Sequence, residues 1–177
     1  MLIYFVRHAN AGKSVANPAQ DAKRPLDKAG VRQSSYVGKA LAALDTQVEV
    51  IISSPLKRAV QTASLIANEL AHDRQIVISE ALGKNADFKA FQELLRKHSK
   101  HDAIMVVGHN PSLSQFISNV ITGNVNGRAV DLKKGAAARV EHDGRKPAVL
   151  QWCITPRIVE TVYQAARTSS RPKTSRK

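Results

Sequence analysis

The segment VEVIISSPLKRAVQTA, residues 48–63, indicates the fold of this 177-residue chain. Its first part, Val48–Ile52, is mostly apolar and β-branched and predicts a buried strand. Ser54 then offers an N-cap hydroxyl before Pro55 at a first helical position, which predicts a helix from there to about Leu70. A strand followed by a short connection and a helix is the repeating unit of α/β folds.

The same alternation runs through the rest of the chain. Short apolar runs rich in β-branched residues are separated by longer stretches with the period of a helix, which predicts an α/β sandwich. We expect a helix over Lys28–Leu44 with Asp27 as its N-cap, since Asp accepts hydrogen bonds from the first free backbone N–H groups. The further strands are expected at Leu2–Val6, Ile76–Ser79 and Ala103–Val107, and the further helices at Ala86–His98 and from Pro111 to about Ile121.

The last third of the chain has a different pattern. Gly123–Gly135 is rich in Gly and Asn and is expected to be a loop, and the turn residues Asp143-Gly144 predict an antiparallel hairpin of Ala136–His142 with Ala148–Ile154. Ile158–Ala166 predicts a last helix. We therefore expect one domain over residues 1–166. Residues 167–177 have the composition of a basic, disordered tail, which could contact an acidic partner.

Composition limits the class of protein. The length suits a single domain, and 43% hydrophobic with 23% charged residues is ordinary for a soluble globular protein. Cys153 is the single cysteine, so an internal disulfide is excluded and a reducing compartment is expected. Arg7 and His8 interrupt the first apolar run, and no run reaches the roughly 20 residues of a membrane span. We expect a cytoplasmic protein without membrane contact.

The formal net charge of +13 indicates an anionic partner. Charge alone does not choose among phosphorylated compounds, nucleic acid and a membrane surface. An aromatic content of only 5%, without an aromatic-rich binding platform or recognition motif, argues against a non-catalytic nucleic-acid-binding module. Phosphorylated substrates therefore fit the charge best.

Polar side chains follow three of the predicted strands. They are Arg7-His8, the segment Ser53–Arg58, and Gly108-His109. In open α/β sheets, ligands bind beyond the carboxyl ends of strands, so these three segments are expected to converge on one site. Arg24, in the loop before the first long helix, could reach the same place.

These residues suit phosphoryl transfer, in which a protein mainly supplies position and positive charge. Arg7, Arg24 and Arg58 could neutralise a phosphomonoester, because the planar guanidinium donates two parallel hydrogen bonds to phosphate oxygens. Cations beside His8 disfavour its protonated form, so its imidazole could act as a nucleophile. His109 follows a glycine that lets backbone approach a ligand, and it could donate a hydrogen bond to a phosphoryl oxygen.

Three motifs give the chain a resemblance to the histidine phosphatase superfamily. Val6–Ala9 (VRHA) resembles the strand-end Arg-His-Gly signature of that superfamily. Ser53–Ala63 (SSPLKRAVQTA) is similar to its Ser-Pro-x-x-Arg-Ala-x-Gln-Thr motif, and Val106–Asn110 (VVGHN) to the motif of its second histidine.

The small SixA-type phosphohistidine phosphatases are the subgroup that the chain resembles most. Lys23–Leu26 (KRPL) followed by Gly30 resembles their Arg-Pro-Leu segment, and Leu150–Trp152 (LQW) resembles their last strand. The likeness spans about residues 1–156. It implies a phosphoglycerate mutase-like three-layer sandwich, with a mostly parallel central sheet and helices on both faces.

For the site, the resemblance implies that His8 is the nucleophile and that Arg7, Arg24, Arg58 and His109 bind the phosphoryl group. It implies a phosphatase that forms a covalent phosphohistidine on His8, without a cofactor. Its substrate would be protein phosphohistidine, with small phosphorylated metabolites as the alternative. Short connections between elements leave little room for recognition of a small metabolite.

Two positions depart from the pattern of the superfamily. Ala9 stands where glycine is usual, which leaves the chemistry intact. Most members carry a glutamate after the third strand as general acid, and here Glu80 is the nearest candidate, with Asp87 beyond it. Glu80 is also compatible with a purely structural or solvent-facing role. No pair of histidines has metal-ligand spacing on one element, so no metal site is expected.

Overall fold

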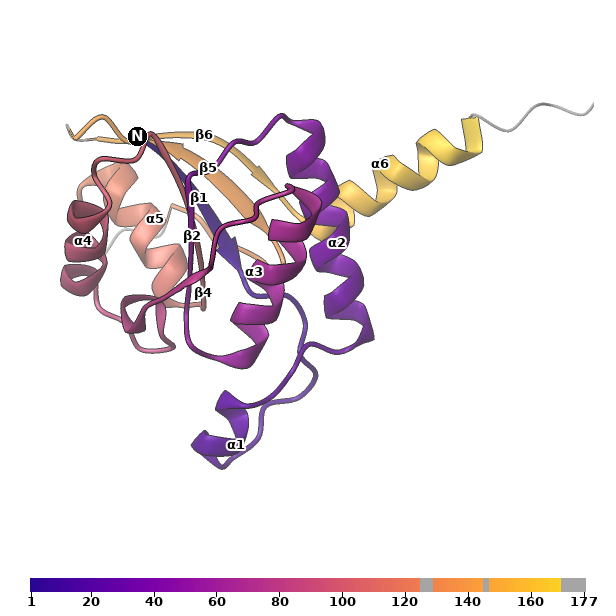
Figure 1. The fold of residues 1–177 in the computed structure, drawn as a ribbon, viewed down its shortest axis with the longest axis horizontal. Coiled ribbons are helices and arrows are strands. Elements are labelled where there is room, and N and C mark those ends of the chain that lie inside the picture. The colour runs from indigo at the N-terminus through magenta and orange to yellow at the C-terminus, as the bar shows by residue number, and fades with distance from the viewer. Residues whose placement is uncertain (125–128, 145–146, 170–177) are drawn as a thin grey trace, which may run out of the picture.

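The computed structural model describes residues 1–124, 129–144 and 147–169. Its centre is a six-stranded sheet with the order β3-β2-β4-β1-β5-β6 (Figure 1). The strands are β1 Leu2–Arg7, β2 Val50–Ser53, β3 Val77–Ile78, β4 Ala103–Gly108, β5 Ala137–Glu141 and β6 Val149–Ile154. The helices are α1 Pro18–Ala22, α2 Lys28–Ala43, α3 Lys57–Glu69, the 3₁₀ helix η1 Glu80–Leu82, α4 Phe88–Lys97, α5 Ser112–Thr122 and α6 Pro156–Ser169.

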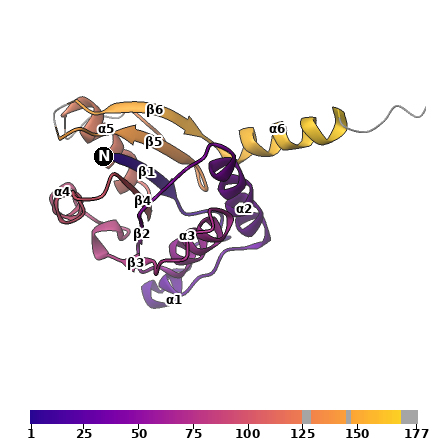
Figure 2. The ribbon, with the colours of Figure 1, turned by 45° about the horizontal axis from the view of Figure 1, so that its top comes forward.

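The sheet is mixed but mostly parallel. Strands β3, β2, β4 and β1 pair in parallel, whereas β5 is antiparallel to both β1 and β6. Helices α4 and α5 cover one face of the sheet, and α2 and α3 cover the other (Figure 2). The predicted three-layer α/β sandwich and the predicted antiparallel hairpin at the C-terminal end are therefore confirmed.

Burial on both faces explains why the central strands read as continuous apolar runs rather than alternating ones. Phe5 of β1 packs toward α4 and α5, where Phe91 and Phe116 stack with ring centroids 4.5 Å apart. Its neighbours Tyr4 and Val6 pack toward α2 and α3 on the other face. The two cores share the sheet and hold its strands in a fixed register.

Helix α3 begins later than the sequence predicts. It starts at Lys57, and Leu56 occupies the N-cap position without a side-chain hydrogen bond to the helix. The expected cap, Ser54, instead lies with its Oγ 2.8 Å from Nε2 of His109. The interpretation of Ser54 as an N-cap was therefore wrong, because a tertiary contact with a distant histidine engages its hydroxyl.

Sequence reasoning also missed the short helices α1 and η1. Asn17 caps α1 by accepting hydrogen bonds from the N–H groups of Ala19 and Gln20, and Pro18 occupies the first helical position. An Asn-Pro pair of this kind is a helix-start signal, but the helix spans only five residues and has no apolar face to reveal it.

Helix α6 is longer than expected and extends away from the body of the molecule (Figure 1). Tyr163 of α6 contacts Tyr36 of α2, with ring centroids 5.8 Å apart. The helix includes residues 167–169, which the sequence analysis assigned to the tail. The rest of that tail, residues 170–177, lies outside the described residues, as do residues 125–128 of the expected loop and residues 145–146 of the hairpin connection.

The carboxyl ends of β1, β2 and β4 meet at one edge of the sheet, because these strands run in parallel. Strand β5 begins at the same edge, since it is antiparallel to β1. We call this the site edge. None of the helices in the described part of the chain is long and apolar enough to span a bilayer.

Candidate active site

Strand register brings His8 and His109 together. Arg7 pairs with Gly108 across β1 and β4, so the next residue of each strand leaves the site edge beside the other. The two imidazole rings have centroids 4.8 Å apart, and the N–H of His8 donates to the carbonyl of Gly108 at 3.0 Å. Two residues separated by about 100 positions in the sequence thus become neighbours through the parallel pairing alone.

The local environment defines which nitrogen of His8 is free. Its Nδ1 lies 2.8 Å from the carbonyl oxygen of Ala9. A carbonyl oxygen can only accept, so Nδ1 carries the proton and Nε2 keeps its lone pair in the neutral ring. Burial, helped by the charges of Arg58, Arg7 and Lys134 and opposed by the bond to Ala9, lowers the pKa of His8 to about 4. His8 is therefore neutral at pH 7.

His109 is held from the opposite side of the ring. Its Nε2 lies 2.8 Å from Oγ of Ser54, and this oxygen also accepts the N–H of Leu56 at 3.3 Å. The Ser54 hydroxyl can donate to Nε2 or accept from it, and in the first case the proton of the neutral ring is on Nδ1. Burial, with contributions from the neighbouring His8 and Arg58, lowers the pKa of His109 to about 3. His109 is thus neutral at pH 7, and it donates from Nδ1 when Ser54 donates to Nε2.

Arg58 and Arg7 lie beside the two histidines. The side chain of Arg58 is almost fully buried and donates from Nη1 to the carbonyl of Asp21 at 2.9 Å. Arg7 donates from Nη1 to the carbonyl of Leu132 at 2.9 Å. Burial is the main cause that lowers the pKa of both guanidinium groups, yet arginine stays protonated at any relevant pH.

Asp21 is a buried carboxylate that the sequence analysis did not select. It has 5% relative exposure, and its Oδ1 accepts from Nε of Arg24 at 2.9 Å while its Oδ2 lies 3.4 Å from Nη1 of Arg58. Burial acts to raise the pKa of Asp21, but the hydrogen bonds from Arg24 and from the Val15 N–H and the charges of both arginines outweigh it and lower the pKa. Asp21 is therefore an anion that links the two guanidinium groups.

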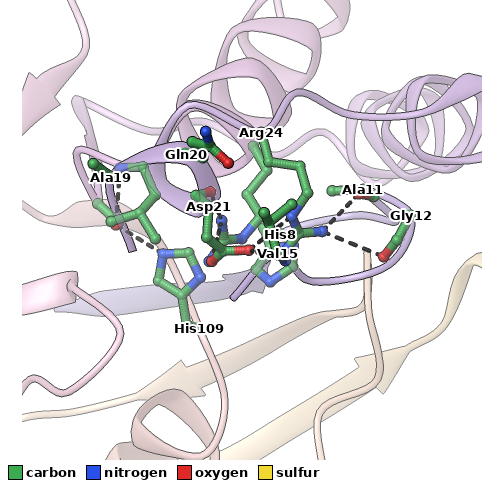
Figure 3. A network of polar contacts seen from close by, with 12 residues as sticks. His8, Ala11, Gly12, Val15, Ala19, Gln20, Asp21, Arg24 and His109 are labelled. Carbon is green, nitrogen blue, oxygen red and sulfur yellow. Dashed lines mark hydrogen bonds and ion pairs between the residues drawn. The ribbon is translucent and has the colours of Figure 1, made fainter. Parts of the chain in front are cut away.

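Arg24 is nearby, but its donors are engaged within the protein. Besides Asp21, it contacts the carbonyl oxygens of Ala11 at 2.6 Å and Gly12 at 3.3 Å (Figure 3). Figure 3 also shows His8, Asp21, Arg24 and His109 gathered around one place. Arg24 thus fastens the loop after β1 to Asp21.

Several donors at this place have no partner in the protein. Among the described residues, the buried side-chain nitrogens without a hydrogen-bond partner include Nε of Arg7, Nε of Arg58 and Nδ1 of His109. Buried polar groups in native proteins are nearly always paired, so unpaired donors that cluster at one site call for a ligand. The two arginines carry positive charge, so an anion is the ligand that these unpaired groups suit best.

Two glycines allow the close packing around the site. A Cβ on Gly108 would lie 2.6 Å from a side-chain carbon of Leu113 of α5. A Cβ on Gly30 would lie 1.9 Å from the carbonyl oxygen of Asn10. The glycine before His109 therefore serves contact with α5, whereas the sequence analysis assigned it to ligand approach.

Glu80 begins η1 and is exposed. No hydrogen bond or ion pair joins its carboxylate to another described residue. Asp87, the acidic residue beyond it, caps α4 by accepting the N–H of Ala90 at 2.7 Å. Within the described ranges, no group of three or more His, Cys, Asp or Glu side chains is arranged to hold a metal ion.

Comparisons with known proteins agree with this arrangement. The profile of the histidine phosphatase superfamily (branch 1) matches residues 3–84. An uncharacterized protein of Picosynechococcus sp. strain PCC 7002 is 34% identical over 137 residues, which are 76% of this chain and 81% of that protein.

Solved structures share the fold. The protein histidine phosphatase SixA complexed with tungstate has a TM-score of 0.80 at 20% identity, over 90% of this chain and 99% of that one. The alpha-ribazole phosphatase from Shigella flexneri has a TM-score of 0.72 at 16% identity, over 88% and 97% of the two chains. At these identities the two structures establish the fold only.

Proposed function

This chain belongs to the histidine phosphatase superfamily, and we propose that it hydrolyses protein phosphohistidine through a covalent phosphohistidine intermediate on His8. The observation that carries the proposal is the state of His8. Its Nδ1–H is held by the Ala9 carbonyl, its Nε2 lone pair is free, and its low pKa keeps the ring neutral at pH 7. A neutral imidazole held in one tautomer is a competent nucleophile.

In the first step, Nε2 of His8 attacks the phosphorus atom and forms an N–P bond while the bond to the leaving group breaks. The leaving group departs with the electron pair of that bond. In the second step, water attacks the phosphorus of the intermediate, the N–P bond breaks, and Nε2 recovers its lone pair. Inorganic phosphate keeps the oxygen of the water, and the remaining proton passes to solvent.

Arg7, Arg58 and His109 stabilise the charge that develops on the phosphoryl oxygens in both steps. Their unpaired donors support this role, because preorganised donors in a buried site stabilise a transition state without reorganisation. Asp21 and Arg24 position Arg58 and the loop after β1. Ser54 positions His109 in the tautomer that donates from Nδ1.

The position of Glu80 favours phosphohistidine as the substrate. An alkoxide leaving group, such as that of a phosphoserine, needs a proton in the transition state. Glu80 is exposed and has no contact that holds it toward His8. Phosphohistidine releases an imidazole that already carries a proton at its other nitrogen, so it needs no acid from the enzyme.

Substrate ranking tests the proposal. We expect the purified protein to turn over a phosphohistidine peptide and a nitrophenyl phosphate, and to act far more slowly on phosphoserine and on sugar phosphates. Acid quenching is unsuitable, so the reaction is stopped with base, in which a phosphohistidine on His8 persists. His8→Ala should abolish both the turnover of substrate and the phosphohistidine that is trapped on the protein.

Other rankings would change the conclusion. Fast turnover of a small phosphorylated metabolite with no activity on phosphohistidine would assign the protein to the metabolite phosphatases of its family. Turnover that survives His8→Ala under metal-free conditions would exclude the covalent mechanism.

A further inference from the structure

Five exposed lysines lie on the segments that surround the site. They are Lys13, Lys23, Lys57, Lys84 and Lys134. None of the five forms an ion pair with a carboxylate of the described residues, whereas their neighbour Lys133 is paired with Asp131. None of the five is among the groups assigned above to contact the phosphoryl group.

Contacts place these lysines beside the site. Nζ of Lys134 lies 3.3 Å from Oδ1 of Asn10, two residues after His8. The backbone carbonyl of Lys84 accepts from Oγ of Ser112 at 3.4 Å, three residues after His109. The positive charges of Lys134 and Lys84 also act on the pKa of His8 and of His109, respectively.

The other three lysines flank the arginine system. Lys57 directly precedes Arg58 at the start of α3, and Lys23 directly precedes Arg24. Lys13 follows Gly12, whose carbonyl accepts from Arg24. The five lysines therefore come from four segments that meet at the site edge, namely the loop after β1 with α1, the start of α3, the turn after η1, and the segment before β5.

Carboxylates at the site edge do not cancel this charge. Asp21 is taken up by Arg24 and Arg58, Asp27 caps α2 and accepts from Asn10, and Asp87 caps α4. Asp131 is paired with Lys133, and Glu80 is exposed at the start of η1. The five unpaired lysines therefore outnumber the carboxylates that could offset them beside the catalytic histidines.

We propose that these five lysines bind an acidic surface of the protein that carries the phosphoryl group. This inference rests on the proposed function, because it assigns the partner of the same site. One phosphoryl group satisfies the buried donors of Arg7, Arg58 and His109, so additional cations on four separate segments fit negative charges spread around it. Such complementarity directs association and selects partners more than it adds to chemistry.

A protein fits these lysines better than a nucleic acid. The exposed cations at the site edge are lysines, whereas Arg58, whose planar fork matches phosphate oxygens, is buried, and Arg7 and Arg24 are half-buried. A nucleic acid would also stack on exposed aromatic side chains, and the segments that carry the five lysines, residues 9–26, 54–58, 83–87 and 129–136, contain no aromatic residue.

Inhibition by poly-L-glutamate tests the inference without a phosphohistidine substrate. Hydrolysis of nitrophenyl phosphate is measured at low salt with increasing polyglutamate, in wild type and in the triple variant Lys57→Glu, Lys84→Glu and Lys134→Glu. We expect polyglutamate to inhibit wild type and its Ki to rise by about tenfold or more in the triple variant, since each exposed charge pair contributes a modest factor. Added salt should weaken inhibition of the wild type.

A matched control separates position from net charge. The triple variant Lys39→Glu, Lys97→Glu and Lys100→Glu changes the net charge equally, and all three lysines are exposed. Lys97 and Lys100 precede β4 and so lie at the opposite edge. In this control the Ki of polyglutamate should stay within about twofold of wild type. A second triple variant with glutamine at Lys57, Lys84 and Lys134 removes the positive charges without adding negative ones. Its Ki should lie between those of wild type and the glutamate variant, and it keeps the test valid if the glutamate variant misfolds.

Equal Ki values for polyglutamate in the two triple variants would overturn the inference. So would stronger inhibition by a duplex oligonucleotide than by polyglutamate at equal charge concentration, which would identify a nucleic-acid surface. A second arm compares two phosphohistidine peptides, flanked by glutamate or by glutamine. Equal turnover of the two peptides would contradict only the inference of an acidic partner. If neither peptide were turned over, only the proposed function would be contradicted.

Discussion

Asp21→Asn is the change that tests most directly how the site is held. The substitution keeps the shape of the side chain and an oxygen that can accept from Nε of Arg24. It removes the negative charge that lies 3.4 Å from Nη1 of Arg58 and 2.9 Å from Nη2 of Arg24. Two guanidinium groups, one of them almost fully buried, then lose their counter-charge.

The geometry gives the size of the effect. Two unit charges 3.4 Å apart interact by about 5 kcal/mol at an effective dielectric constant of about 20. Removal of one partner from a buried ion pair typically costs about 3–5 kcal/mol, and the retained hydrogen bond recovers about 1 kcal/mol. We therefore expect a loss of about 2–4 kcal/mol in the free energy of unfolding, and a Tm lower by roughly 10 °C for a chain of this length.

Activity should also fall, because Arg58 loses the carboxylate that orients it. A displacement of about 1 Å in a catalytic group costs about 10²-fold, so kcat on nitrophenyl phosphate should fall by about that factor at a temperature where the variant is folded. The exposed pair of Glu93 and Arg96 supplies the control, and Glu93→Gln should leave Tm and kcat unchanged.

The outcome separates two roles for Asp21. A lower Tm with unchanged kcat would mean that Asp21 only stabilises the fold. A Tm equal to that of Glu93→Gln would refute the electrostatic reasoning itself.

Four further outcomes are expected. The pKa of His8 is lowered from about 6.5 to about 4, so kcat/KM for an aryl phosphate, corrected for substrate ionisation, should show no enzyme pKa near 6.5. As the pH falls, His8 is protonated in the unfolded chain near pH 6.5 but in the folded protein only near pH 4. The contribution of His8 to the free energy of unfolding is therefore complete above about pH 6.5 and is lost as the pH falls toward 4, which urea denaturation at different pH values would measure. The rate of hydrolysis of substituted phenyl phosphates should rise steeply with the acidity of the leaving group, and the slope should be the same in wild type and in Glu80→Gln. A shallow slope in wild type that becomes steep in the variant would instead show that Glu80 is a general acid. Deletion of residues 170–177, which hold no large apolar side chain, should leave kcat/KM for nitrophenyl phosphate unchanged, whereas a loss would make the tail part of the domain.

The sandwich could be predicted from the sequence because its central strands are buried on both faces. Val50–Ser53 and Ala103–Gly108 are buried throughout and mostly apolar, and such runs separated by helical periodicity have few other interpretations. Element ends were less certain. The start of α3 was placed too early because capping signals are local, whereas the contact between Ser54 and His109 depends on pairing of β2 with β4.

The site was predictable in part for the same reason. Arg7, His8, Arg58 and His109 follow strands whose carboxyl ends meet, so topology alone brings them together. Asp21 carries no such signal. It lies in a short helix in the connection between β1 and α2, and an acidic residue three positions before an arginine is an ordinary feature of exposed segments. Its role becomes visible only when Arg58, from another element, is found against it.

Asp21 and a bound phosphoryl group would both supply negative charge to the arginines of the site. Burial keeps His8 neutral and therefore nucleophilic, while the buried Nε atoms of Arg7 and Arg58 have no partner among the described residues. Asp21 offsets the positive charge of Arg58 through its carboxylate and accepts from Nη1 of Arg58 through its carbonyl, but it does not pair with the Nε atoms. In the proposed mechanism, a phosphoryl group supplies the further negative charge. The positive charge of the site is therefore balanced only when an anion is bound. This favours phosphoryl transfer, because the phosphoryl oxygens stay negatively charged throughout the reaction.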